Sequence, residues 1–159
     1  MSGKEYNKCV DDYSEMLFKY FVKNISDKES AQDLTQDAFL ALWKRHNEIE
    51  ISKAKAFLFI SAHNLMINYI NYTKKQLIIK NDWSKKEIGF EEMAFENKNL
   101  VNHLIEKLPA VMKECIVLRD LQGFSYKQIA QITEMTEENV KINVFRARMQ
   151  LKKILMSMK

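Results

Sequence analysis

Residues 124–153 read FSYKQIAQITEMTEENVKINVFRARMQLKK, and this stretch decides the fold of the C-terminal part of the chain. Ser125 and Gln128 have the spacing of a capping box, which predicts that a short helix begins here. The segment Thr133–Met135 is then expected to form a turn, and Thr136 can cap a second helix whose first turn is acidic. Two helices joined by such a short turn are typical of a DNA-binding helix-turn-helix.

The second predicted helix presents two chemically different faces. An apolar stripe at helical spacing is expected to pack on the preceding helices. The stripe consists of Val140, Val144, Ala147 and Leu151. On the opposite face, amide and basic side chains can read adenine, guanine or phosphate, and apolar ones can contact a thymine methyl. The candidates for contacts with duplex DNA are Glu138, Asn139, Lys141, Ile142, Asn143, Phe145 and Arg146.

The last part of the chain is basic. Residues 141–159 contain six Lys or Arg and no Asp or Glu, in a chain whose net charge is +4. A basic stripe on a terminal helix is expected of a nucleic-acid binder, whereas the alternative is a solvated basic helix in a plain helical hairpin. The caps, the short turn and the basic end together favour the nucleic-acid binder.

Helical periodicity also runs through the first half of the chain. It predicts helices over residues 13–24 and 54–75, and between them a helix that Ser26 or Asp27 caps. The stretch His46–Lys53 lacks the pattern and is expected to be a loop. The 159 residues include only three Gly and one Pro, which argues against an all-β fold because strands need frequent turns.

We therefore predict an all-α protein with two small helical domains joined by a linker. The first domain spans residues 8–75, the linker residues 76–100, where periodicity weakens, and the second domain residues 101–159. Within the second domain, Pro109 is expected to break one helix or to open the next, and Gly123 to end the helix before the helix-turn-helix.

Composition excludes several classes of protein. Hydrophobic residues make up 47% and charged residues 29%, which is the balance of a globular protein. No apolar run approaches the roughly 18 residues of a membrane span, and the first residues lack a signal-peptide core, so we expect a cytoplasmic location. Cys9 and Cys115 lie far apart and no Cys/His spacing suggests zinc, so we expect reduced thiols, no metal and no cofactor.

Two sets of motifs match one known family. In the second half they are Leu108-Pro109, Gly123, Phe124-Ser125-Tyr126, Ile129-Ala130 and Val140-Lys141, followed by Arg146-Ala147-Arg148. In the first half they are Asp33-Leu34-Thr35-Gln36-Asp37-Ala38-Phe39 with Leu42-Trp43, and Ala56-Phe57-Leu58 followed by Asn64-Leu65 and Tyr69. The chain thus resembles the extracytoplasmic-function sigma factors, in their region 4 and in regions 2.2 to 2.4. The resemblance implies a bacterial transcription initiation factor without enzymatic activity, which directs core RNA polymerase to promoters.

The resemblance assigns region 2.2 to docking on a coiled coil of the largest polymerase subunit. The candidate contacts are Asp33, Gln36, Asp37 and Trp43. For Leu34, Phe39 and Leu42 we prefer simple core packing, and for Trp43 both a polymerase contact and a core position are open.

The helix over residues 54–75 and the loop before it are implied to bind the −10 element as single-stranded DNA. Stacking aromatics and amide groups can capture unstacked bases. The candidates are Ser52, Lys53, Asn64, Asn68, Tyr69, Asn71, Tyr72, Lys74 and Lys75. Tyr69 is equally plausible as a core residue. Many family members carry Arg, Asp and Arg where this chain has His63, Asn68 and Asn71, so the −10 sequence is not transferred from relatives.

Region 4 is implied to bind the duplex −35 element with the face of the second helix listed above. Arg119, Tyr126 and Lys127 are candidates for phosphate contacts, which position the protein without specifying sequence. Ile142 and Asn143 replace a common Ser-Arg pair. This replacement predicts an altered −35 preference, with Asn143 reading adenine.

The resemblance also implies partners. They are core RNA polymerase, through the coiled coil of its largest subunit and its flap, promoter DNA, and an anti-sigma factor, which in this family is frequently membrane-anchored. The weakly patterned linker would allow the two domains to be spaced differently in these complexes.

Two other classes of protein fit parts of the sequence. A helix-turn-helix regulator whose first domain senses a ligand or dimerises would explain the C-terminal half, but not the residues similar to region 2.2. A helical enzyme would need a phosphate-binding glycine loop, a metal cluster or a nucleophile with its base. The sequence shows none of these, and Asp33 and Asp37 form only a carboxylate pair on one helix face. We therefore expect no enzyme and no small-molecule substrate.

Overall fold

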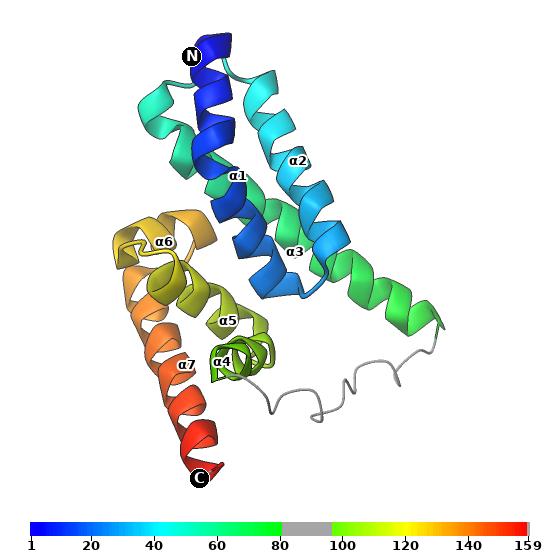
Figure 1. Cartoon of the computed structure of the whole chain (residues 1–159), viewed down its shortest axis with the longest axis vertical. Helices are drawn as coiled ribbons and strands as arrows, with labels where there is room; N and C mark the ends of the chain where they lie inside the picture. The colour runs from blue at the N-terminus through cyan, green and yellow to red at the C-terminus, as the bar shows by residue number, and fades with distance from the viewer. Residues whose placement is uncertain (81–96, 159) are drawn as a thin grey trace.

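The computed structural model describes the backbone of residues 1–80 and 97–158, with side chains at residues 1–79 and 100–158 (Figure 1). All regular structure in these residues is helical, which confirms the predicted all-α fold. The elements are α1 (Gly3–Ile25), α2 (Lys28–Lys44), a 3-10 turn η1 (Ile51–Lys53), α3 (Ala54–Lys80), α4 (Asn97–Glu106), α5 (Ala110–Ile116), a π-helical turn η4 (Val117–Leu121), α6 (Tyr126–Thr133) and α7 (Glu137–Ser157).

Helices α1, α2 and α3 form an N-terminal unit in which each helix contacts the other two. The core of this unit is apolar and aromatic, and its members Leu17, Phe21, Leu42 and Leu58 are fully buried. Leu34 and Phe39 are also buried, so the preference for core packing at these two residues and at Leu42 is confirmed. Burial of such side chains contributes about 1.5–3 kcal/mol each.

Side-chain caps set the start of α1 and α2. The Ser2 hydroxyl accepts from Glu5 N at 3.1 Å, and the Glu5 carboxylate accepts from Ser2 N at 2.9 Å, which completes a capping box. Asp27 accepts from the backbone of Glu29 and Ser30 and is therefore the cap of α2, while Ser26 ends α1 in the left-handed conformation with φ 58°. The choice between Ser26 and Asp27 is thus decided.

Two helices are longer than the sequence predicts. Helix α1 begins at Gly3 rather than at residue 13, because the capping box starts it and Cys9 is buried among its neighbours although the first ten residues are mostly polar. Helix α3 continues to Lys80, so its predicted end at residue 75 is five residues too early. Residues 81–96 of the predicted linker lie outside the described residues, and its last four residues, 97–100, belong to the start of α4.

Helices α4 to α7 form a C-terminal unit. Pro109 is the N-cap of α5, and α5 continues directly into the wider turn η4. Gly123 then adopts φ +78°, a left-handed conformation that favours glycine. The predicted caps Ser125 and Thr136 are confirmed, and the turn between their helices consists of Glu134, at φ 59°, and Met135.

The two units pack against each other, with α6 beside α3 and with α4, α5 and η4 beside α1 (Figure 1). The rings of Phe59 and Phe124 meet edge to face with centroids 4.8 Å apart. Two side chains of the C-terminal unit bond to the backbone of α1: Gln122 Nε2 donates to Met16 O at 2.8 Å, and Lys113 Nζ donates to Asn24 O at 3.0 Å. The contact between the units is therefore partly apolar and partly polar.

Replacing Thr136 tests the cap that starts α7. The Thr136 hydroxyl accepts from Asn139 N at 3.1 Å, and Thr136→Ala removes this bond and leaves a helix donor without its partner. We expect the free energy of unfolding to fall by about 1 kcal/mol, measured by urea denaturation. The control Thr136→Ser retains the hydroxyl and should stay close to the parent. Equal stability of the Ala and Ser variants would contradict the role of the cap.

Candidate nucleic-acid interface

The exposed face of α7 carries the side chains predicted to meet duplex DNA. Val140, Val144 and Ala147 are fully buried and hold the helix against its neighbours, so the opposite face is turned outward. Phe145 is 64% exposed there and Ile142 is also exposed, so this face presents apolar side chains among the polar ones. The other exposed members of this face are Glu138, Asn139, Lys141 and Arg146.

Asn143 lies on the same face but is half-buried. Its Nδ2 donates to Asn139 O at 2.8 Å, one turn earlier on the helix. A bidentate contact with adenine uses one Nδ2 hydrogen and Oδ1 of an Asn amide, and the bond to Asn139 leaves the second Nδ2 hydrogen and Oδ1 of Asn143 for such a contact.

A cluster of cations is ordered by one aromatic ring. The Arg119 guanidinium lies 4.2 Å from the centroid of the Tyr126 ring, and Lys141 Nζ lies 5.7 Å from the same centroid. Arg119 also donates from Nη1 to Phe124 O at 3.0 Å. The structure thus brings Arg119 and Tyr126, two predicted phosphate contacts, together with Lys141, a predicted base contact. These contacts join η4, α6 and α7. Lys127, the third predicted phosphate contact, is exposed in the first turn of α6.

The two arginines of the Arg-Ala-Arg motif have different surroundings. Arg148 donates from Nε to Asp120 Oδ2 at 2.9 Å and from Nη2 to Asp120 Oδ1 at 2.5 Å. These hydrogen bonds to Asp120 raise the pKa of Arg148 above its ordinary value. Arg148 therefore ties α7 to η4, whereas Arg146 is exposed and available to a ligand.

Helix α3 carries a strip of amide, aromatic and basic side chains on one face. Asn64, Asn68, Asn71, Tyr72 and Lys75 recur at helical spacing and all are exposed, as is Lys74. Tyr69 is half-buried and packs against the core, so it has a structural role in this arrangement.

The remaining −10 candidates, Ser52 and Lys53, lie in η1 at the other end of α3. A helix rises about 1.5 Å per residue, so about 30 Å of α3 separates η1 from Lys74 and Lys75. The structure therefore brings most of the predicted strip together, but it does not bring these two groups to one point.

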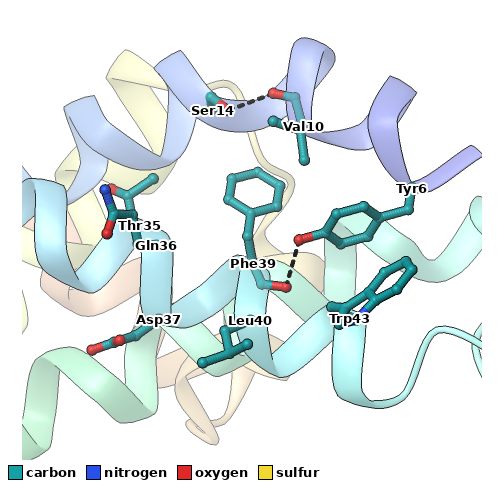
Figure 2. Close-up of a pocket in the computed structure, with 9 residues that line it drawn as sticks. All are labelled: Tyr6, Val10, Ser14, Thr35, Gln36, Asp37, Phe39, Leu40 and Trp43. Atoms are coloured by element: carbon teal, nitrogen blue, oxygen red, sulfur yellow. Dashed lines mark hydrogen bonds between the residues drawn. The ribbon is translucent and has the colours of Figure 1, made fainter. Parts of the chain in front are cut away.

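A groove between α1 and α2 contains three of the four predicted polymerase contacts (Figure 2). Its volume is about 530 Å³, and it is lined by Tyr6, Val10, Ser14, Thr35, Gln36, Asp37, Phe39, Leu40 and Trp43. The fourth predicted contact, Asp33, is exposed on α2 and does not line the groove.

Trp43 is 44% exposed, which excludes the core position that the sequence left open. Its ring stacks on His46 at a centroid distance of 4.0 Å and meets the ring of Tyr6 at 4.9 Å. The Tyr6 hydroxyl donates to Phe39 O at 3.0 Å, so α1 holds one wall of the groove against α2.

Sequence reasoning missed Tyr6, Val10 and Leu40 in this groove. The first two belong to the part of α1 that was not predicted to be helical. Leu40 is exposed although it lies beside the apolar stripe of α2. Its position three residues before Trp43 and four after Gln36 is the signal that could have identified it.

A buried polar network was also missed. Glu114 of α5 accepts from the Tyr20 hydroxyl at 2.5 Å and lies 2.7 Å from Nδ1 of His63. The partners are 94 and 51 residues away in sequence, so no local pattern could reveal them.

No three His, Cys, Asp or Glu side chains lie together in a way that could hold a metal ion, among the residues that the structure describes. In the same part of the chain, no helix has the length and apolar character needed to cross a membrane.

Two family models match successive parts of the chain. Residues 9–76 match the family model of Sigma-70 region 2, and residues 98–151 match that of Sigma-70, region 4. The ECF RNA polymerase sigma factor SigM of Bacillus subtilis is 28% identical over 144 residues, covering 88% of each chain. The RNA polymerase sigma-H factor of Pseudomonas aeruginosa is 24% identical over 167 residues, covering 96% of this chain and 86% of the relative.

Two solved structures share the fold. The sigma factor RpoE of Bartonella quintana, in complex with the anti-sigma factor NepR, superposes with a TM-score of 0.76 at 24% identity, covering 96% of this chain and 98% of that one. CnrH in complex with the cytosolic domain of CnrY has a TM-score of 0.70 at 20% identity, covering 96% and 88%. At these identities the likeness concerns the fold alone.

Replacing Asn143 tests whether its amide reads a base. We expect Asn143→Ala to lose a preference for adenine at one position, because a methyl group cannot pair with the adenine edge. Selection of bound sequences from a pool of random duplexes would measure this. An unchanged base preference in the variant would show that Asn143 reads no base.

Proposed function

The chain belongs to the sigma-70 family of RNA polymerase sigma factors, in its extracytoplasmic-function group, and from this premise we propose that it binds core RNA polymerase, directs it to specific promoters and helps to melt the −10 region. The observation that carries the proposal is the presence of three separate contact surfaces on the two units. They are the exposed face of α7, the strip on α3 and the groove between α1 and α2.

The face of α7 is suited to the duplex −35 element. Its helix is held by a buried stripe, capped at its start and flanked by the Arg119, Tyr126 and Lys141 cluster. Cations that are already oriented lose less entropy when they bind phosphate. The cluster would set the position of α7 in the major groove, and the exposed side chains beyond it would read bases.

The strip on α3 is suited to single-stranded DNA. Exposed Asn side chains can bond to the edges of unpaired bases, and Tyr72, which is 64% exposed, offers a ring on which a base can stack. Lys74 and Lys75 supply positive charge for the backbone at the same end of the helix. Capture of unstacked bases on this strip would favour the melted state of the −10 region.

The groove between α1 and α2 is suited to a helix of the polymerase coiled coil. Exposed Leu40 and Trp43 offer apolar contact area, and Gln36 and Asp37 at the wall can bond to polar or basic side chains of that helix. Protein interfaces usually have an aromatic anchor at the centre and polar residues at the rim.

A second groove, on the C-terminal unit, is the candidate site for the polymerase flap. It has a volume of about 500 Å³ and is lined by Ile116, Asp120, Arg148, Leu151, Lys152, Leu155 and Met156. We further propose that an anti-sigma factor binds this protein, because RpoE, which shares its fold, forms a complex with the anti-sigma factor NepR. A regulator with a sensing or dimerising first domain does not account for the match of residues 9–76 to region 2.

Run-off transcription tests the proposed function directly. With purified core polymerase and genomic fragments, the protein should yield products from specific promoters, whereas core polymerase alone should not. The same fragments with Lys141→Ala and Arg146→Ala together should yield less product, because phosphate and base contacts of α7 are lost. The absence of any promoter-specific product with the parent protein would refute the proposal.

Two single variants separate polymerase docking from DNA reading. Trp43→Ala should weaken binding to core polymerase by about 2 kcal/mol, because an aromatic anchor at an interface centre is removed. Phe145→Ala, which removes another exposed aromatic side chain, on α7, should leave binding to core polymerase unchanged and weaken binding to duplex promoter DNA. Fluorescence anisotropy with labelled protein measures the first affinity, and parent-like affinity of Trp43→Ala for core polymerase would rule out the groove as the docking site.

A further inference from the structure

Helix α7 carries a second apolar stripe, on its exposed face. The members of this outer stripe, each between 39% and 64% exposed, are Ile142, Phe145, Met149 and Met156. At about 100° per residue, the four side chains lie within an arc of about 60°, and the buried stripe lies on the opposite side of the helix. The C-terminal unit therefore covers one apolar face of α7 and leaves the other open.

The outer stripe is longer than the surface that is proposed to meet duplex DNA. A helix rises about 1.5 Å per residue, so the stripe runs for about 21 Å from Ile142 to Met156. A recognition helix reads base edges with its N-terminal residues, and the predicted DNA contacts of α7 end at Arg146. Contact with DNA therefore does not account for the exposure of Met149 and Met156.

Basic side chains border the outer stripe on both sides. The same spacing of about 100° per residue gives their places around the helix. All four are exposed, and they are Arg146 and Lys153 on one side and Lys141 and Lys152 on the other. The sequence has no Asp or Glu from residue 141 to residue 159. This face of α7 therefore fits a partner that is both apolar and anionic.

We propose that the outer stripe and its bordering cations bind the surface of an anionic phospholipid bilayer. Helix α7 would lie parallel to the bilayer plane, with the apolar side chains inserted between the headgroups and the cations on lipid phosphates. A basic amphipathic helix is typical of this kind of contact. The proposal adds a peripheral membrane contact to the proposed function and does not depend on that function.

The arrangement of the helices leaves this face open to a flat surface. Helix α7 contacts α4, α5 and α6, and it runs along the edge of the C-terminal unit, away from the N-terminal unit (Figure 1). The bordering Lys and Arg side chains can lay their apolar stems along the bilayer and keep their charges at the headgroups. These stems widen the apolar face beyond the outer stripe itself.

A protein helix or a second copy of this chain fits the outer stripe less well. Between Met149 and Met156, the helical repeat of the stripe falls on Lys152 and Lys153. A partner helix packed there would bury a lysine charge in an apolar seam, whereas at a bilayer surface the ammonium group reaches water and phosphate. A second copy would bring two basic faces without acids together, and like charges repel.

The bilayer and duplex DNA would compete for α7. Ile142, Phe145 and Arg146 belong both to the face that would bind lipid and to the predicted −35 contacts, so the helix cannot serve both at once. Lys152 and Met156 also line the groove that is proposed for the polymerase flap. This consequence rests on the proposed function: protein bound to the bilayer would be withheld from promoters.

Vesicle flotation with the full-length chain tests the contact. Vesicles of equimolar phosphatidylglycerol and phosphatidylcholine should bind the protein at least about tenfold more tightly than vesicles of phosphatidylcholine alone, because only the former offer net negative charge. Met149→Gln makes one member of the stripe polar and should lower the affinity for the anionic vesicles about fivefold. Val111→Gln, at an apolar side chain of similar exposure on α5, is the matched control and should leave that affinity unchanged.

Tryptophan fluorescence separates insertion of the stripe from adsorption by charge alone. In a background with Trp43→Phe and Trp83→Phe, Met149→Trp should shift its emission to shorter wavelength on anionic vesicles, because its ring leaves water. Gln150→Trp, about 100° around the helix, should shift much less. Circular dichroism of each variant checks that its helices are intact. Parent-like affinity of Met149→Gln, equal shifts of the two tryptophan variants, or no binding of the parent to anionic vesicles overturns the proposal.

The outcome is separable from that of the proposed function. The vesicle measurements contain neither DNA nor polymerase, and run-off transcription contains no lipid. Promoter-specific products from a protein that does not bind anionic vesicles would overturn the lipid contact and leave the proposed function standing. Vesicle binding that Met149→Gln weakens, without any promoter-specific product, would support the lipid contact and refute the proposed function.

Discussion

The packing of α3 against two different partners is the constraint on which the rest of the structure depends. Leu58, Ala62 and Met66 lie on one side of this helix and are buried in the N-terminal core. Phe59 and His63 lie on the adjacent side and meet the C-terminal unit. At about 100° per residue these two sides leave a third arc free, and the exposed asparagines occur on that arc. The position of the strip therefore follows from what the other two arcs bury.

In the C-terminal unit, buried residues and ion pairs leave selected side chains free to meet DNA. Val140 and Val144 hold α7 in place, and the Arg148–Asp120 pair ties its middle to η4. Tyr126 gathers Arg119 and Lys141 at one end of the surface. Charges held in this way can position a protein on the phosphate backbone of DNA. The exposed side chains between them can adjust their conformation to contact bases.

The contact between the units differs chemically from the cores within them. The cores are apolar, and separation of their helices would expose large areas to water. The contact between the units combines the apolar Phe59–Phe124 pair with Glu114 and its two buried partners, Tyr20 and His63.

Local patterns in the sequence determined the helices, the caps at Ser125 and Thr136, the buried stripe of α7 and the family, because these depend on residues within a turn or two of each other. They failed at the start of α1, where a capping box and tertiary burial outweigh a polar composition. Only the tertiary structure decided that Trp43 is exposed beside Tyr6, that Tyr126 gathers two cations, and that Glu114 joins Tyr20 to His63. The physical reason is distance along the chain: the energy of these contacts depends on side chains that meet only after the helices have packed.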